Sequence, residues 1–302
     1  MSNSHLLKID SLTQLHSLFG LDKPRHPLVS VVKLEDVDIA AGSLPDLLVL
    51  NFYKVAYKMD LNGSMKYGQN YYDFGEGGLL FTAPNQPFQS PDSAKKSGFL
   101  LFFHPDFLQS YPLAKKINQY GFFSYKANEA LHLSEAEKVT VVAVLKIIQE
   151  ELDSRIDDYS QEIVISQIEL LLNYSHRFYK RQFITRKAVN SKLLDKMETM
   201  LDDYFNNDEA LQQGLPTVQY LADHLHLSAG YLSDMLRSLT GQNAQQHIHY
   251  KLIEKAKELL STTELSVSEV AYQLGFEHPQ SFNKLFKTKA KLSPLAFRQS
   301  FN

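Results

Sequence analysis

Two short stretches near the C-terminal end of the chain carry small and polar side chains at helical spacing. The candidate contact residues are Gly230, Ser233, Asp234 and Arg237 in the first stretch, and Gln280, Ser281, Asn283, Lys284 and Lys287 in the second. Amide side chains can bind a base through two hydrogen bonds, whereas Lys and Arg bind guanine or backbone phosphate. Positions three or four residues apart share one helix face. The pattern therefore predicts two helices that each present a polar face to double-stranded DNA.

The first polar face requires a helix-turn-helix unit over about residues 217–239. Leu221, Ala222 and Leu225 recur at helical spacing, and Ala222 is small where two helices must cross closely. Ser228 is a good N-cap for the second helix of the unit. The apolar positions of that helix face inward, and they are Leu232, Met235, Leu236 and Leu239.

The second polar face belongs to a similar unit over about residues 266–290. Ser266 and Glu269 form the S-x-x-E pattern of a capping box. Gly275 fits the left-handed position after the first helix, and Pro279 suits the first turn of the next helix because it has no N–H to leave unpaired. A joining helix over about residues 244–260 connects the two units. With a helix over about 190–205, these elements predict an all-α domain over residues 186–302.

From Thr217 to Arg298 the sequence resembles the DNA-binding domain of the AraC/XylS family of bacterial transcription regulators. The matching runs include Tyr231-Leu-Ser-Asp-Met-Leu-Arg237, Glu269-Val-Ala-Tyr-Gln-Leu-Gly-Phe276 and Ser293-Pro-Leu-Ala-Phe-Arg298. The resemblance implies a sequence-specific transcriptional regulator that is not an enzyme. It implies double-stranded DNA, RNA polymerase and a small-molecule effector as partners, and a homodimer as the assembly.

Three residues depart from the family pattern. Lys291 stands where the family usually has Gly, so a differently shaped helix end is expected there. Lys251 replaces a common Arg, which keeps the charge but loses the two-pronged geometry. Asp234 places a carboxylate on the first polar face, where it either accepts from a cytosine amino group or orients Arg237.

The composition predicts a cytoplasmic protein of two domains. The chain has 302 residues, no cysteine and a net charge of −3. From Leu215 onward there are 9 Lys and Arg against 7 Asp and Glu, so this part carries +2 and the remainder −5. DNA binding must then depend on where the charges lie. The N-terminal residues lack a secretion signal, and no apolar run approaches the ~18 residues of a membrane span.

The N-terminal part predicts a different fold class, so the whole chain is expected to be α+β. Short aromatic and β-branched segments with turns between them, over about residues 28–104, are typical of a small β-barrel or sandwich. Asn62-Gly63 is a hairpin turn signal. The run Gly77-Gly-Leu-Leu-Phe-Thr-Ala-Pro-Asn-Gln-Pro resembles a cupin-like sensor domain. With helices over about 134–180, this gives a sensing domain over residues 1–185.

A metal-dependent cupin enzyme with an accessory helical domain is the alternative from another function class. Such enzymes need clustered His and carboxylate ligands, but the turn after Pro84 offers no histidine and His104 stands alone. The pairs His224/His226 and His247/His249 are two residues apart on predicted helices, which points their members to different sides. No catalytic residue, cofactor or metal site is therefore expected.

Two long helices follow the predicted strands, from Ser134 to about 154 and from about 161 to 180. Their apolar stripes include Val141, Leu145, Ile148 and Leu152 in the first, and Val164, Ile168, Leu171 and Phe178 in the second. These stripes either form a dimer seam or pack against their own domain. The basic run from Arg177 to Lys192 is either a solvated helix end or an arm that contacts phosphate.

The predicted strands are dense in aromatic residues: Phe52, Tyr53, Tyr57, Tyr71, Tyr72, Phe74, Phe81, Phe99, Phe102 and Phe103. These rings either line a cavity for a small organic effector, bound without a metal, or fill the core. A DNA-binding protein without ligand sensing is the alternative that goes with a filled core.

Overall fold

The computed structural model describes residues 6–38, 47–59, 65–67, 70–72, 77–89, 97–154, 157–207 and 209–301. The chain divides into two compact units, Met1–Gln182 and Phe183–Asn302, and each is described by itself. Asn62, Gly63 and Phe74 lie outside the described residues, and so do the side chains of Tyr71 and Tyr72.

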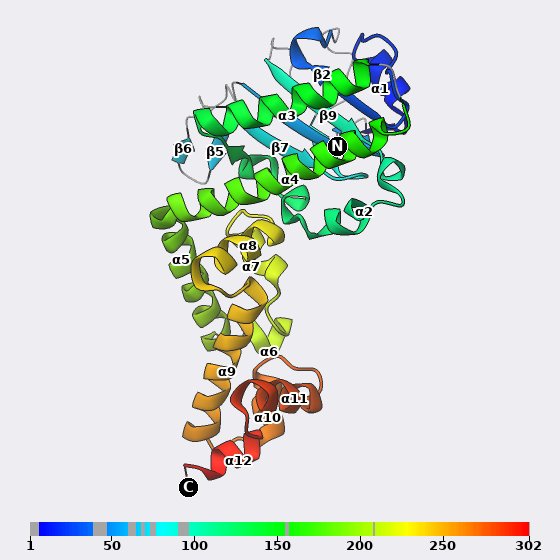
Figure 1. The fold of residues 1–302 in the computed structure, drawn as a ribbon. Helices are drawn as coiled ribbons and strands as arrows, with labels where there is room; N and C mark the ends of the chain where they lie inside the picture. The colour runs from blue at the N-terminus through cyan, green and yellow to red at the C-terminus, as the bar shows by residue number, and fades with distance from the viewer. Residues whose placement is uncertain are drawn as a thin grey trace. The chain divides into compact units, whose positions relative to one another are not determined.

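The first unit contains two main β-sheets (Figure 1). The five-stranded antiparallel sheet has the order β10 (Leu131–His132), β7 (Gly78–Thr82), β4 (Tyr53–Lys58), β9 (Gly98–Phe103), β2 (Val29–Lys33). The three-stranded sheet has the order β1 (Leu6–Ile9), β3 (Leu47–Leu50), β8 (Pro87–Gln89), with β1 parallel to β3. A separate hairpin pairs β5 (Met65–Tyr67) with β6 (Asn70–Tyr72).

The predicted mixed α+β class is confirmed, and the sheets form a sandwich. Among the described residues the strands do not close into a barrel, because β10 and β2 stay at opposite edges of their sheet. Two strands, β1 and β10, also lie outside the predicted range of 28–104. They were missed because each is too short to show alternation of apolar and polar residues.

Apolar side chains fill the space between the two sheets. One core cluster joins Leu48 and Leu50 of β3 to Ala56, Leu100 and Phe102 of the five-stranded sheet. Six of the predicted aromatic residues are buried, namely Phe52, Tyr57, Phe81, Phe99, Phe102 and Phe103. The part of the aromatic set that the structure describes therefore serves mainly as core.

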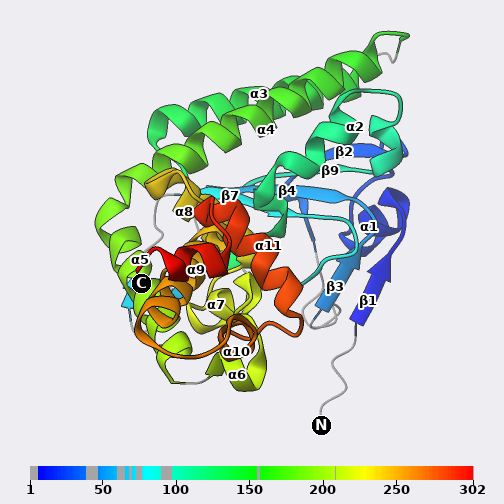
Figure 2. The same ribbon diagram turned by 90° about the horizontal axis from the view of Figure 1, so that it is seen from below.

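Helices α3 (Glu135–Asp153) and α4 (Ser160–Thr185) lie across one face of the five-stranded sheet (Figures 1 and 2). Their predicted apolar stripes are turned inward: Val141, Leu145, Ile148, Val164, Ile168, Leu171 and Phe178 are buried within the single chain, and Leu152 is half-buried. These stripes therefore pack against their own unit. They do not form the dimer seam that the sequence left open.

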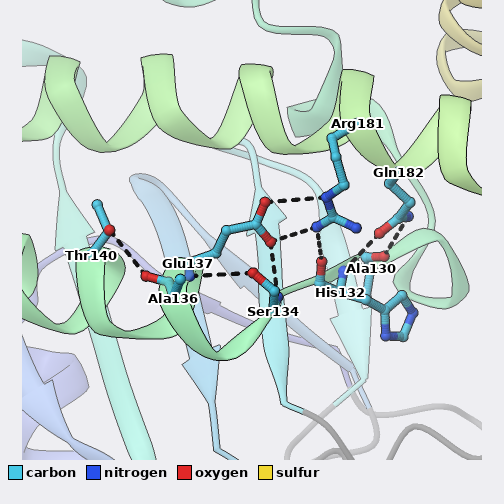
Figure 3. Close-up of polar contacts among 8 residues, drawn as sticks. All are labelled: Ala130, His132, Ser134, Ala136, Glu137, Thr140, Arg181 and Gln182. Carbon is cyan, nitrogen blue, oxygen red and sulfur yellow. Dashed lines mark hydrogen bonds and ion pairs between the residues drawn. The ribbon is translucent and has the colours of Figure 1, made fainter.

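Arg181 of α4 joins the start of α3 to the end of the sheet (Figure 3). Its Nε and Nη2 donate to the Glu137 carboxylate at 3.1 and 2.6 Å, and Nη2 also donates to the His132 carbonyl at 2.7 Å. Glu137 in turn accepts from the backbone N–H of Ser134 at 2.8 Å, which completes a capping box. Arg181 thus has a structural partner, although it belongs to the predicted basic run.

Short helices connect these elements: α1 (Leu12–Leu18), α2 (Leu113–Lys116) and the 3-10 turns Leu34–Asp36, Pro105–Leu108, Ile117–Gln119, Gly121–Ser124 and Ala127–Glu129. The second unit is all helical, with α5 (Lys187–Asn206), α6 (Glu209–Gln213), α7 (Val218–His224), α8 (Ala229–Thr240), α9 (Ala244–Thr262), α10 (Val267–Gln273), α11 (Pro279–Ala290) and α12 (Pro294–Gln299). In the described part of the chain, no helix combines the length and apolar character needed to cross a membrane.

Candidate nucleic-acid interface

The first helix-turn-helix unit consists of α7 and α8, and both helices begin at hydroxyl caps. Thr217 accepts from the backbone N–H of Tyr220 at 3.0 Å, and Ser228 accepts from that of Tyr231 at 3.1 Å. Between them His226 adopts a left-handed backbone with φ 59°. This turn lets Leu225 and Leu227 both point into the core.

The candidate residues of the first unit lie on α8, but not all are equally accessible. Gly230, Ser233 and Asp234 are half-buried, whereas Arg237 is exposed. Arg237 Nη1 donates to Asp234 Oδ1 at 2.8 Å. The sequence left two roles open for Asp234, which are to accept from a cytosine amino group or to orient Arg237. This ion pair is the contact that the second role requires.

The second unit consists of α10 and α11, and its predicted turn geometry is confirmed. The Ser266 N–H donates to Glu269 Oε2 at 2.7 Å, and the Glu269 N–H donates to Ser266 Oγ at 3.2 Å. Hydrogen bonds to the Glu269 carboxylate, first from the Ser266 side chain and then from the Ser266 backbone, hold the pKa of Glu269 below its usual value. Gly275 adopts the left-handed φ of 89°, and Pro279 is at the start of α11.

Helix α11 separates its apolar and polar residues completely. Phe282 and Phe286 are fully buried on one side. All five candidates of this unit are exposed, and these are Gln280, Ser281, Asn283, Lys284 and Lys287. His278, the N-cap residue of α11, is exposed as well.

The joining helix α9 forms the core that both units share. It contacts α7 and α8 as well as α10 and α11, and its buried residues are Ala244, Ile248, Leu252, Ile253, Ala256, Leu259 and Leu260. Lys251 Nζ lies 2.6 Å from Asp202 Oδ1 of α5, and this hydrogen bond raises the pKa of Lys251. Lys251 is therefore engaged in helix packing here.

Arg298 of α12 fixes the connection between α9 and α10. Its Nε donates to the Leu260 carbonyl at 3.1 Å and its Nη2 to the Leu265 carbonyl at 2.5 Å. Leu260 is in the last turn of α9 and Leu265 is in the loop that follows. The Arg298 guanidinium thus donates to a carbonyl that has no partner within the helix and to one in the loop. The sequence did not assign this role, because Arg298 is more than 30 residues away from both partners.

The end of α11 corrects one expectation from the sequence. Lys291 adopts the left-handed conformation, with φ 64°, and its N–H bonds the Lys287 carbonyl. The helix therefore ends with the geometry that Gly would give, as α8 does at Gly241 with φ 78°. Lysine pays a steric cost in this conformation that glycine does not.

Lys291→Gly is expected to stabilise the second unit by up to about 1 kcal/mol, because it relieves the strain of a left-handed lysine. The gain stays small, since glycine also increases the conformational entropy of the unfolded chain. The matched control is Lys289→Gly, two residues earlier in a regular helical conformation, which should destabilise by about 0.5–1 kcal/mol. Thermal unfolding of the full chain compares the two. Destabilisation by both variants would contradict the left-handed assignment.

Three histidines of this unit each have a different partner. His224 Nδ1 lies 2.8 Å from the Tyr220 carbonyl, His247 Nε2 lies 2.9 Å from Thr240 Oγ1, and His249 Nε2 lies 3.0 Å from Gln245 Nε2. Within the described ranges, no three His, Asp or Glu side chains gather as a metal site requires.

Residues 221–300 match the family model described as "Helix-turn-helix domain". The HTH-type transcriptional activator RhaS of Escherichia coli is 28% identical over 152 residues, which is 50% of this chain and 50% of that protein. The HTH-type transcriptional regulator YfiF of Bacillus subtilis is 28% identical over 142 residues, which is 47% of this chain and 42% of that protein. The chain thus matches about half the length of these curated relatives.

Two solved structures are similar to the C-terminal part. The C-terminal domain of the response regulator yesN from Fusobacterium nucleatum is 35% identical, with 33% of this chain and 95% of that chain covered and a TM-score of 0.29. The DNA-binding domain of AdpA in complex with a target DNA is 27% identical, with 34% of this chain and 91% of that chain covered and a TM-score of 0.29.

Proposed function

We propose that this chain, whose C-terminal domain belongs to the AraC type of helix-turn-helix domains, is a sequence-specific DNA-binding regulator of transcription. The observation that carries the proposal is the polar face of α11, where five exposed polar side chains lie opposite two fully buried phenylalanines. A helix of this kind, held by a short helix across its back, can enter a major groove. The protein acts through binding rather than catalysis in this proposal.

The two helix-turn-helix units are proposed to read adjacent major-groove segments on one face of the duplex. Helix α9 has 19 residues, so it spans roughly 28 Å. Successive major grooves lie about 34 Å apart, a separation that recognition helices on either side of α9 can reach with slight DNA bending. Footprinting of the full chain on its genomic sites should show two protected segments about one helical turn apart for each monomer. Protection of a single segment would contradict this arrangement.

Asn283 is proposed to read a base, whereas Lys287 is proposed to meet phosphate. Asn283→Ala should weaken the preferred site by ~1–3 kcal/mol and change affinity for random DNA little, because only a base contact depends on sequence. Lys287→Ala should weaken both DNAs and reduce the salt dependence. Titration of both duplexes at several salt concentrations tests the pair. Equal losses on both duplexes for Asn283→Ala would show that it reads no base.

The remaining candidates of the interface have proposed roles that follow their exposure. Gln280, Ser281 and Lys284 share the exposed surface of α11 with Asn283. On α8, Arg237 is proposed to make the main contact, positioned by Asp234. Gly230 and Ser233 are half-buried, and their small size is proposed to allow close approach of the backbone to the groove.

The first unit is proposed to sense a small organic effector and to provide dimer contacts, and the DNA-bound form is proposed to recruit or block RNA polymerase. An effector can act only if it binds one arrangement of the protein more tightly than another. For the dimer, the support is a set of apolar side chains that remain exposed on α3 and α4, namely Val139, Ile147, Ile163 and Leu170.

Leu170→Lys is expected to shift the dimer toward monomer by about tenfold or more, because a symmetric contact loses two apolar side chains. Sedimentation velocity across a concentration range measures the shift. Ser17→Lys, at an exposed position near the end of α1, is the control for added charge. A wild-type chain that stays monomeric would exclude the dimer, and an unchanged association with Leu170→Lys would exclude this face.

A further inference from the structure

Strand β2 forms an open edge of the five-stranded sheet. Its inner side pairs with β9, and among the described residues no strand pairs with its outer side. Directly before β2, the Leu28 carbonyl accepts from the His104 N–H at 2.7 Å. Backbone groups in an antiparallel ladder turn inward and outward at alternate residues. Ser30 and Val32 therefore bond to β9 as Leu28 does.

The backbone N–H and C=O groups of Val29, Val31 and Lys33 point away from the sheet for the same reason. In the part of the chain that the structure describes, no hydrogen bond reaches these groups. The pairing of β2 with β9 is regular, the strand contains no proline, and its one charge is at its last residue, Lys33. An edge with unpaired donors and acceptors, without a bulge or proline to block it, is a template for another strand.

A groove of about 410 Å³ follows this open edge. Its walls are residues 20–25 after α1, β2 itself, and Gln149, Leu152 and Asp153 at the end of α3. All five residues of β2 line the groove. Because successive side chains of a strand point to opposite faces of the sheet, the groove runs along the edge and not under one face. The outward backbone groups of β2 are thus in a groove that an extended segment can enter.

The charges of the groove favour a partner that carries both signs. Sites for small molecules are mostly apolar, whereas this groove is lined by three basic and three acidic side chains, all exposed: Lys23, Arg25 and Lys33, and Asp22, Asp36 and Asp153. Within the described ranges, no ion pair engages any of these six. A surface with equal numbers of unpaired charges of both signs is complementary to a copy of itself, because each sign can meet its opposite.

We propose that the β2 edge pairs antiparallel with the β2 edge of a second copy of this chain, about a two-fold axis at Val31. The outward groups are placed symmetrically for this pairing, since Val29 and Lys33 each lie two residues from Val31. Val31 then lies opposite the partner's Val31, and Val29 lies opposite the partner's Lys33. The three pairs of outward residues exchange about six hydrogen bonds. This contact goes beyond the proposed function, because it uses neither the DNA interface nor the exposed face of α3 and α4.

Covalent capture suits this contact, because a strand of five residues buries less than the ~1,200 Å² of a stable interface and exchanges quickly. The chain has no cysteine of its own, so a single introduced thiol reports one position. In the proposed register the Cα atoms of Val31 and the partner's Val31 are about 5.5 Å apart, which a disulfide spans. Lys33 and the partner's Lys33 are about 14 Å apart along the strands, which a disulfide cannot span.

The experiment oxidises the full chain, without DNA, with copper phenanthroline and follows covalent dimer by non-reducing electrophoresis. Val31→Cys should form the dimer at least about tenfold faster than Lys33→Cys, because only the former pair meets at the axis. Lys33 is the matched control, since it is exposed whereas Val31 is half-buried, so random collision would favour Lys33→Cys. Equal rates, or a faster reaction of Lys33→Cys, would overturn the proposal.

Leu170→Lys separates this contact from the proposed dimer face on α3 and α4. Added to Val31→Cys, it should leave the rate of covalent dimer formation unchanged within about twofold, because Leu170 is on α4 and does not line the groove. A large fall in that rate would place the crosslink at the α3–α4 face and overturn the pairing of β2 edges. DNA binding is not involved in either outcome, and the duplex titrations alone decide it.

Proline substitutions test the direction of the backbone groups. Relative to alanine at the same position, Val31→Pro should lower the melting temperature of the full chain by less than about 5 °C, since it removes only an outward N–H. Val32→Pro should lower it much further, because it removes a hydrogen bond to β9. Equal losses at the two positions would show that Val31 does not offer its N–H to a partner, and the proposal would fail.

Discussion

Gly275→Ala is expected to destabilise the second unit by about 2–5 kcal/mol and to abolish the contribution of α11 to DNA binding. Two costs add: about 1–2 kcal/mol for a left-handed residue with a Cβ, and about 1–3 kcal/mol for forced overpacking. A Cβ at Gly275 would lie 2.6 Å from the Gly214 carbonyl carbon and 2.7 Å from the Ala210 carbonyl oxygen. Both neighbours are backbone atoms, one in α6 and one in the residue that follows it, so they cannot move aside as a side chain can.

Gly241→Ala separates these two costs. Gly241 is left-handed as well, with φ 78°, but a Cβ there would meet no atom within 4 Å. This control should therefore lose only the ~1–2 kcal/mol of backbone strain. Urea denaturation and duplex titration of the full chain measure both variants. If Gly275→Ala lost no more stability than Gly241→Ala, then α6 would not approach the α10–α11 turn as closely as described.

Glu137→Ala is expected to destabilise the first unit by about 2–4 kcal/mol. The Glu137 side chain is 14% exposed, and it accepts from Arg181 and from the Ser134 N–H (Figure 3). Its loss removes one end of a capping box and leaves the Arg181 guanidinium without its counter-charge. The upper limit stays below that of a fully buried pair, since the Arg181 side chain is 36% exposed.

Glu135→Ala is the matched control in the same helical turn. Glu135 pairs with Lys138 at 2.6 Å, but its side chain is 87% exposed, so the loss should stay below about 0.5 kcal/mol. The double variant Glu137→Leu with Arg181→Met should recover much of the loss, because both charges are then removed together. Thermal unfolding of the full chain ranks the three. Equal losses of stability for Glu137→Ala and Glu135→Ala would show that the Glu137–Arg181 ion pair does not stabilise the first unit.

Local sequence features sufficed to predict the helix-turn-helix units. Each of their caps and turns depends on residues within a few positions of one another. These are the caps at Ser228 and Ser266, the left-handed turn at Gly275 and the start of α11 at Pro279. Helical periodicity then assigned the buried and exposed sides of α11. These interactions are local, so the amino-acid order alone specifies them.

The same periodicity identified the inner faces of α3 and α4 but not their partners. A stripe such as Val164, Ile168 and Leu171 shows that a face is buried, and it does not show whether a sheet or a second copy covers it. In the structure this face is buried within the same chain. The aromatic strands were ambiguous in the same way, since a ring that fills a core and one that lines a cavity have the same spacing.

Only the tertiary structure determined the contacts between residues far apart in the chain. Arg181 meets Glu137 across 44 residues, and Arg298 reaches Leu260 across 38. Separate segments are also joined where β1 pairs with β3 and where the Lys54 amine lies over the Phe88 ring. Lys291 shows the limit within a single helix, because its side chain disfavours the left-handed conformation that the packing of α11 and α12 imposes. The sequence by itself thus determined the helices and their polar faces, whose causes are local, while packing decided which faces and charges meet.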